Sequence, residues 1–139
     1  MEKFVWSEEY NIGINEIDGQ HKHFLEIANK IIDVTIGQNP TKEQIFNLLE
    51  ELGNYAFYHF GIEEGYFDKF NYQEAPLHID AHNNYRETIR KYLEDIRKED
   101  VDINKMTEEI VSYSTDWLLK HIVVMDKKYT QYFHEHGLN

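Results

Sequence analysis

Apolar residues recur at intervals of three and four residues in four segments of the chain, which is the pattern of amphipathic helices. The expected helices span residues 18–37, 41–68, 75–98 and 103–133. The pattern breaks at Pro40 and Pro76, and Thr41 followed by Gln44 is the capping-box signature of a helix start. Because no segment alternates with period two, no strands are expected. Four helices with short connections predict an all-α fold, an antiparallel up-down-up-down four-helix bundle.

Both ends of the chain fall outside this simple pattern. Residues 1–17 are expected to form an irregular N-terminal arm, with Trp6 and Ile12 packing onto the helices. Near the C-terminus, three aromatic residues pack either on their own bundle or on a neighbouring chain: Tyr129, Tyr132 and Phe133. Residues 1–139 are enough for one domain with a buried core, and a hydrophobic content of 41% suits a packed globule.

The composition excludes several classes of function. A formal net charge of −12 argues against nucleic acid as a partner, because phosphate backbones are bound by clustered Lys and Arg. The chain contains no cysteine, which excludes disulfides and thiolate metal sites. No basic stretch followed by an apolar run opens the sequence, and apolar runs such as residues 122–125 are too short to cross a bilayer. We therefore expect a soluble, cytoplasmic protein without a membrane partner.

Five histidines occupy the inward-facing, otherwise apolar stripes of the expected helices: His21, His59, His78, His82 and His121. A single histidine on such a face is usually a hydrogen-bonded core residue, since a buried polar group is costly without a partner. Five of them in one small bundle are better explained by a shared metal site, which supplies all of them with a partner at once. Imidazole and carboxylate ligands suit iron, and they also suit zinc, manganese and copper.

The spacing of these residues supports a common site. His59 and Glu63 are four residues apart, as are His78 and His82, so each pair lies on one face of a helix. In an antiparallel bundle, the late part of the second helix lies beside the early parts of the first and third helices. His121 lies past the middle of the fourth helix and reaches the same end. All of the stripe histidines are therefore expected at one end of the bundle.

The other polar residues in these segments have simpler interpretations. The remaining histidines are expected to be solvated: His23, His134 and His136. Glu64 falls off the inward face and is expected to be a surface charge. Asp126 stands five residues after His121, which on an ideal α-helix is not a natural pair, so spacing alone does not nominate it as a ligand.

Five motifs of the sequence resemble the hemerythrin family, and the similarity extends over almost the whole chain. The motifs are Trp6–Tyr10, Ile17–Lys22, His59–Glu64, His78–His82 and Trp117–Asp126. The resemblance implies one hemerythrin-like domain with two non-haem iron ions, bridged by an oxo or hydroxo group and by two carboxylates. The implied ligands are His78, His82 and His121 for one iron, His21 and His59 for the other, and Glu63 and Asp126 as bridges.

This ligand set leaves one coordination position open on the iron held by only His21 and His59, and a small molecule such as O2 would bind there. Reversible binding also requires a dry pocket, and Leu118 and Trp117 are its expected lining. Three further residues are weaker candidates, which ordinary core packing explains at least as well: Phe60, Ile122 and Val123. The chain departs from the family's usual residues at three positions that are not implied ligands: Phe67, Gln73 and Ala81.

Three functions fit the resemblance. The first is reversible O2 binding for storage, delivery or sensing, without enzymatic turnover. The second is a di-iron oxidoreductase that consumes peroxide or nitric oxide, although the sequence contains no additional acid–base pair for such chemistry. The third is a regulatory module whose iron reports oxygen or redox state to a separate protein partner.

Overall fold

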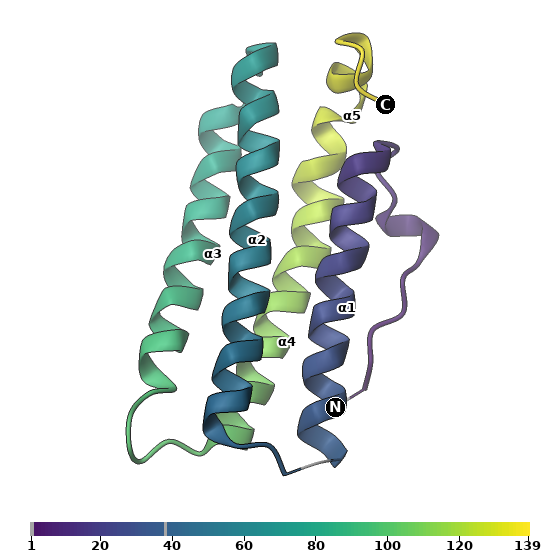
Figure 1. The fold of residues 1–139 in the computed structure, drawn as a ribbon. Helices are drawn as coiled ribbons and strands as arrows, with labels where there is room; N and C mark the ends of the chain where they lie inside the picture. Colours follow the sequence, from purple (N-terminus) through teal and green to yellow (C-terminus); the bar gives the residue numbers. More distant parts are fainter. Residues whose placement is uncertain (1, 38) are drawn as a thin grey trace.

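Four long helices form an antiparallel bundle in the computed structural model, which describes residues 2–37 and 39–139 (Figure 1). The helices are α1 (Asn15–Gly37), α2 (Lys42–Phe70), α3 (Ala75–Asp95) and α4 (Ile103–His121). A π-helical turn, η2 (Ile122–Asp126), then leads directly into the short helix α5 (Lys127–Glu135). The described residues contain no strand, which confirms the predicted all-α, up-down-up-down bundle.

Helix α1 begins three residues earlier than the sequence pattern predicted, at Asn15 instead of Asp18. Asp18, at which the helix was expected to begin, lies inside the first turn and is nearly buried. Its carboxylate accepts hydrogen bonds from the backbone N–H groups of Ile12 and Gly13, at 2.8 and 3.1 Å. Gly13 has a φ of +86°, a conformation that favours glycine. Asp18 therefore holds the preceding chain, bent at Gly13, against the start of the helix.

The N-terminal arm runs alongside α1 in the opposite direction (Figure 1). It contains one short 3₁₀ helix, η1 (Glu8–Tyr10). The side chain of Asn29 on α1 makes hydrogen bonds of 2.7 and 2.9 Å with the backbone N–H and carbonyl of Phe4. Ile12 is buried and Trp6 is partly buried against the core, as the sequence predicted. The arm is thus held by hydrogen bonds from the Asn29 side chain to its backbone as well as by apolar packing.

The remaining helix ends follow local sequence signals. The capping box of Thr41 and Gln44 is confirmed, with both reciprocal hydrogen bonds present at the start of α2. Helix α2 ends at Phe70, where Asn71 takes the left-handed conformation that terminates helices. Pro76 lies in the first turn of α3, a position that does not need its missing N–H. At the start of α4 the Asp102 carboxylate accepts the N–H of Lys105, which is an ordinary N-cap.

Two details of the predicted helices were wrong in the C-terminal half of the chain. Helix α3 ends at Asp95, short of the predicted residue 98, and the expected helix over residues 103–133 is interrupted by the π-helical turn. The C-terminal aromatic residues pack on their own bundle, because Tyr129 and Phe133 are completely buried. The Tyr132 hydroxyl donates a hydrogen bond to the backbone carbonyl of Phe70. These contacts close one end of the bundle.

Each helix buries one apolar face in a common core. Helices α2 and α3 pack closely at Gly53, where an added Cβ atom would lie 3.2 Å from a methyl group of Ile89. In the described part of the chain, no helix combines the length and the apolar character needed to cross a membrane.

Candidate metal centre

Seven polar residues from five elements meet inside the bundle, close to the end where α2 finishes and α3 begins. Their exposed fractions are between 0 and 5%. They are His21 on α1, His59 and Glu63 on α2, His78 and His82 on α3, His121 on α4, and Asp126 at the end of η2. The structure thus brings together all seven residues that the resemblance implied, and we call this group the buried polar cluster.

The ligand-type atoms of the buried polar cluster form two overlapping groups. Within each group, one nitrogen or oxygen atom of each residue lies within 4.8 Å of those of the other members. One group contains Glu63 with three histidines, and the other contains Glu63 and Asp126 with two histidines. The histidines of the first group are His78, His82 and His121, and those of the second are His21 and His59. This division has the same three-and-two pattern that the family resemblance implies.

Asp126 lies between the two groups. Its Oδ1 atom is 3.0 Å from Nε2 of His78 and 3.1 Å from Nε2 of His121. Its Oδ2 atom is 3.2 Å from Nε2 of His21, on the other side of the cluster. One carboxylate therefore offers an oxygen atom to each group of histidines.

The π-helical turn explains why helical spacing did not nominate Asp126. In an α-helix, five residues make about 1.4 turns, which would point Asp126 away from His121. In a π-helix, each backbone bond joins residues five apart, so residue i+5 follows residue i on nearly the same face. Residues 122–126 adopt this geometry, and the two side chains converge. A local change of helical register therefore supplies the seventh residue of the cluster.

Glu63 makes the corresponding contacts from α2. Its Oε1 atom is 2.9 Å from Nε2 of His59 and 3.5 Å from Nε2 of His82. The other oxygen accepts a 2.5 Å hydrogen bond from the hydroxyl of Tyr129, which is completely buried. Tyr129 on α5 therefore fixes the orientation of the Glu63 carboxylate.

Two further residues contact histidine rings of the cluster on the side away from its centre, and neither role was predicted from the sequence. Nδ1 of His59 lies 2.6 Å from the side-chain oxygen of the buried Gln20. Nδ1 of His82 lies 2.7 Å from a carboxylate oxygen of Glu64. An imidazole that donates its Nδ1–H in this way presents the Nε2 lone pair to the interior, as a metal ligand requires.

The prediction that Glu64 is a surface charge was wrong. Its side chain is 23% exposed, and it accepts two hydrogen bonds from Arg86, at 2.8 and 3.1 Å, as well as the one from His82. Arg86 stands four residues after His82 and therefore lies on the same face of α3. That basic residue was the available signal that an acidic side chain of α2 faces this position.

The electrostatic balance favours ionised carboxylates in the cluster. Burial and the charge of Asp126 oppose ionisation of Glu63, but the neighbouring imidazoles of His59 and His82 outweigh them and hold its pKa below its usual range. Burial likewise opposes ionisation of Asp126, and His121, His21 and His78 together hold its pKa well below the usual value. Burial lowers the pKa of His21, which keeps that ring neutral.

The donor set fits a cation. Four buried atoms of the cluster have no hydrogen bond of acceptable geometry: Glu63 Oε1, His82 Nε2, and both carboxylate oxygens of Asp126. Imidazole nitrogens and carboxylate oxygens nevertheless lie 2.9–3.5 Å apart, for example between Glu63 and the rings of His59 and His82. Buried polar atoms without partners are costly, and buried charges are normally paired or coordinated to metals. Cations bound between the facing nitrogen and oxygen atoms would satisfy these atoms together.

Aromatic side chains cover part of the buried polar cluster. The ring of Trp117 stacks on His121 with centroids 4.4 Å apart, and Phe60 stacks on His82 at 4.2 Å. Leu118 is buried in the core. Val123 is 44% exposed because it lies on the outer side of the π-helical turn, so it does not line a dry pocket.

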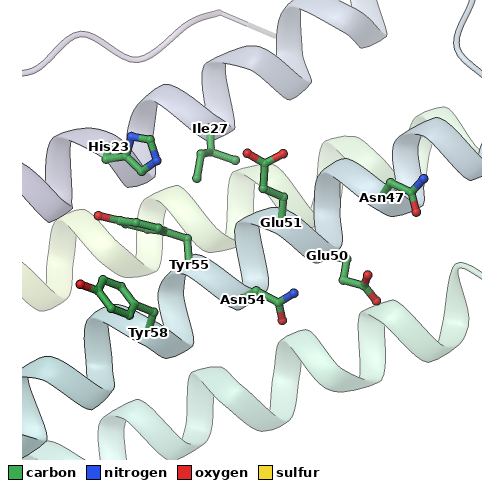
Figure 2. A pocket seen from close by; sticks show the side chains of 8 residues that line it. All are labelled: His23, Ile27, Asn47, Glu50, Glu51, Asn54, Tyr55 and Tyr58. Carbon is green, nitrogen blue, oxygen red and sulfur yellow. The ribbon is translucent and has the colours of Figure 1, made fainter.

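The three other histidines lie outside the buried polar cluster. His23 is exposed on α1 and contacts the ring of Tyr55 at 4.5 Å, in a surface groove of about 480 Å³ between α1 and α2 (Figure 2). His134 is exposed, and its Nε2 lies 2.8 Å from the carbonyl oxygen of Gly13, which connects α5 to the arm. His136 is also exposed, near the C-terminus. These positions agree with the prediction that the three rings are solvated.

The protein is thus a four-helix bundle that encloses five histidines and two carboxylates, a set of side chains suited to metal binding. The family model of the hemerythrin HHE cation-binding domain matches residues 12–133. The chain therefore belongs to the hemerythrin family.

Individual relatives agree with this assignment. A bacteriohemerythrin of Clostridium acetobutylicum is 29% identical over 128 residues, which cover 91% of this chain and 98% of the relative. A bacteriohemerythrin of Pseudomonas aeruginosa is 30% identical over 123 residues, which cover 88% of this chain and 76% of the relative. The crystal structure of a wild-type hemerythrin superposes with a TM-score of 0.83 at 24% identity, covering 94% of this chain and 97% of that one, and this likeness supports the fold.

Proposed function

We propose that this chain binds O2 reversibly at a pair of iron ions held in the buried polar cluster, within a single domain that spans residues 1–139. His78, His82 and His121 would hold one iron, His21 and His59 would hold the other, and Glu63 and Asp126 would supply carboxylate oxygens to both. The observation that supports this most directly is the division of the cluster into two overlapping ligand groups, with three and two histidines. Membership of the hemerythrin family supports iron over the other metals that such ligands accept.

Bound iron would supply the electrons that O2 accepts reversibly, and the surrounding residues determine how this chemistry is contained. Gln20 and Glu64 orient the rings of His59 and His82, so that Nε2 of each ring faces the centre. Tyr129 holds Glu63 through its hydroxyl hydrogen bond. These contacts keep ligand atoms in place while the ligand at the open position changes.

The uneven number of histidines supports a specific position for O2. An ion held by His21 and His59 would have one fewer imidazole than its neighbour and would therefore retain a position for an external ligand. Leu118, Phe60 and Ile122 are buried, and we expect them to exclude water from the site. A dry environment favours reversible binding, because water and protons promote loss of reduced oxygen species.

A second candidate function, a di-iron oxidoreductase, is supported by a surface groove. The groove has a volume of about 250 Å³, and the residues that line it include Ala81, Trp117 and His121. It gives a small oxidisable or reducible molecule a route to the edge of a proposed ligand. Steady turnover of peroxide or nitric oxide with a reductant would favour this candidate over O2 binding.

An oxygen-uptake measurement tests the proposal. Iron-loaded protein is reduced under argon, freed of reductant and mixed with a known amount of O2 in a closed oxygen-electrode cell. We expect uptake of one O2 for each pair of irons and its release when the free O2 is removed by argon. Uptake that continues only while reductant is supplied would support the oxidoreductase, and absence of uptake by protein that contains two irons would contradict O2 binding.

A further inference from the structure

A continuous row of oxidisable aromatic rings leads away from the buried polar cluster between α3 and α4. It begins at Trp117, which stacks on the imidazole of His121 with a 12° angle between the rings and 4.4 Å between their centroids. The ring centroids of Trp117 and Tyr85 are 4.7 Å apart, and those of the stacked rings of Tyr85 and Tyr113 are 5.9 Å apart. Tyr113 contacts Tyr92 at 6.0 Å. We call these four residues, from Trp117 to Tyr92, the aromatic row.

The aromatic row crosses back and forth between two helices. Trp117 and Tyr113 lie one turn apart on α4, and Tyr85 and Tyr92 lie two turns apart on α3, so rings from the two helices alternate. Tyr85 is completely buried, whereas Tyr92 is partly exposed towards the opposite end of the bundle. The row therefore connects the cluster with solvent at a distant point.

The chemistry of these side chains is more specific than core packing requires. Indole and phenol rings lose an electron far more readily than the benzene ring of Phe, which fills the same volume. Offset and tilted contacts between aromatic rings are a normal feature of cores, so their geometry alone indicates packing. In this row, however, each ring that follows His121 is Trp or Tyr, and no Phe interrupts the sequence of contacts.

We propose that Trp117, Tyr85, Tyr113 and Tyr92 form an electron-transfer path between His121 and the surface of the protein at Tyr92. Electron tunnelling slows steeply with distance, and the row replaces one long transfer by several short ones. The path gives the protein a second activity, in which electrons from a one-electron reductant at the surface reach an oxidised metal centre. The acceptor at His121 rests on the proposed function, whereas the path itself is a property of the four rings.

The net step is balanced with hydrogen peroxide as the oxidant. For each peroxide, two electrons pass through the path one at a time, and with two protons they convert the peroxide into two molecules of water. In each transfer Tyr92 loses one electron and releases its phenol proton. The one-electron reductant then returns the electron and the phenol oxygen takes back a proton, while the two protons consumed in forming water come from solvent. The other three rings return to their starting states. Glu109 lies near Tyr92, where its charge, after burial, contributes to a raised pKa of the phenol, and it is a nearby acceptor for the proton.

A second aromatic group on the other side of the cluster provides a control. Tyr129 contacts the ring of His78, and Tyr72 contacts Tyr129 at 6.3 Å. The aromatic contacts of Trp117 in the described chain are with Phe60, Tyr85 and His121, so this second group is not joined to Trp117 directly. Tyr72→Phe therefore changes a tyrosine near the cluster without changing the aromatic row.

Pulse radiolysis tests the path independently of the metal chemistry. The chain has two tryptophans, so in a Trp6→Phe background azide radicals can form a tryptophan radical only at Trp117. Air-oxidised, iron-loaded protein is used, so that ferrous iron does not donate the electron. We expect the absorption of the tryptophan radical to decay while that of a tyrosyl radical grows, at a rate independent of protein concentration.

The variants locate the transfer. Tyr85→Phe in the same background should abolish the concentration-independent phase, and Tyr72→Phe should leave it unchanged. Both variants retain an aromatic ring, and circular dichroism verifies that both remain helical. Equal transfer rates in Tyr85→Phe and in its parent would overturn the proposal. This result does not depend on whether the protein binds O2.

A peroxide experiment tests the connection to the metal centre. Iron-loaded protein is treated with hydrogen peroxide and a nitroso spin trap, and the trapped tyrosines are identified by mass spectrometry. We expect an adduct at Tyr92 that is lost in Tyr113→Phe and retained in Tyr72→Phe. Absence of an adduct at Tyr92, or an equal yield in Tyr113→Phe, would refute a path from His121 to this surface.

Discussion

Replacing Glu64 with Gln tests whether residues behind the proposed ligands hold the metal. Gln preserves the size of the side chain but removes its charge. In the protein, the Glu64 carboxylate lies 2.7 Å from Nδ1 of His82 and accepts two hydrogen bonds from Arg86. The substitution weakens the bond that orients His82 and leaves the guanidinium of Arg86 without its carboxylate partner.

The expected effect follows from the strength of this contact. A hydrogen bond to a charged group contributes about 1.5–3 kcal/mol to stability. Because the Glu64 side chain is 23% exposed, solvent screens part of the interaction, so we use the lower part of that range. A loss of about 1.5–2 kcal/mol corresponds to roughly a 10- to 30-fold weaker metal affinity. This value agrees with the loss of about 10- to 100-fold seen when contacts behind metal ligands are removed.

Competition with a coloured ferrous chelator measures this affinity directly. The matched control is Glu94→Gln, which removes a carboxylate from an exposed ion pair with Arg90. We expect the control to bind iron as the parent does, because exposed ion pairs contribute only about 0–1 kcal/mol and this one lies on the surface. An affinity of Glu64→Gln equal to that of the control would refute the reasoning.

Three further predictions concern the buried polar cluster. Leu118→Ala should speed autoxidation of the oxygenated protein, because the smaller side chain opens space beside the site. The rate is measured from the loss of the protein's visible absorption, and an unchanged rate would remove Leu118 from the pocket. His121→Ala should lower the iron content measured by elemental analysis, whereas the exposed His134→Ala should retain it; two irons per chain in both would contradict the ligand assignment. Burial lowers the pKa of His82, but the neighbouring carboxylates of Glu63 and Glu64 outweigh it and raise the pKa to about 9, so the metal-free ring is protonated at neutral pH. Metal uptake should therefore release protons, and the metal affinity should increase as the pH rises towards 9. Calorimetry in buffers of different ionisation enthalpy measures this proton release, and its absence would contradict the prediction.

The spacing of apolar residues predicted the bundle, because the bundle forms by burying the apolar face that this spacing produces on each helix. The same spacing placed His59 next to Glu63 and His78 next to His82, since an α-helix repeats almost every four residues. The helix starts at Thr41 and near Pro76 were likewise predicted from local sequence signals, the capping box and the proline. These features need no knowledge of the rest of the fold.

Other features depend on contacts that the spacing does not contain. Asp126 faces the cluster only because residues 122–126 form a π-helical turn, and nothing in the periodicity announces this change of register. Its role was expected from the family resemblance alone. Gln20 acts across helices on His59, and Glu64 acts across helices on His82, so their partners become visible only when the helices are packed. The early start of α1 likewise depends on the bend at Gly13.

The most direct test of reversible O2 binding is the visible absorption spectrum of iron-loaded protein through repeated cycles of anaerobic reduction, exposure to air and removal of O2. We predict an absorption band that appears with air, fades when O2 is withdrawn under argon and returns with the next exposure, without further reductant. A spectrum that changes once on exposure to air and reverts only when reductant is added would contradict reversible binding.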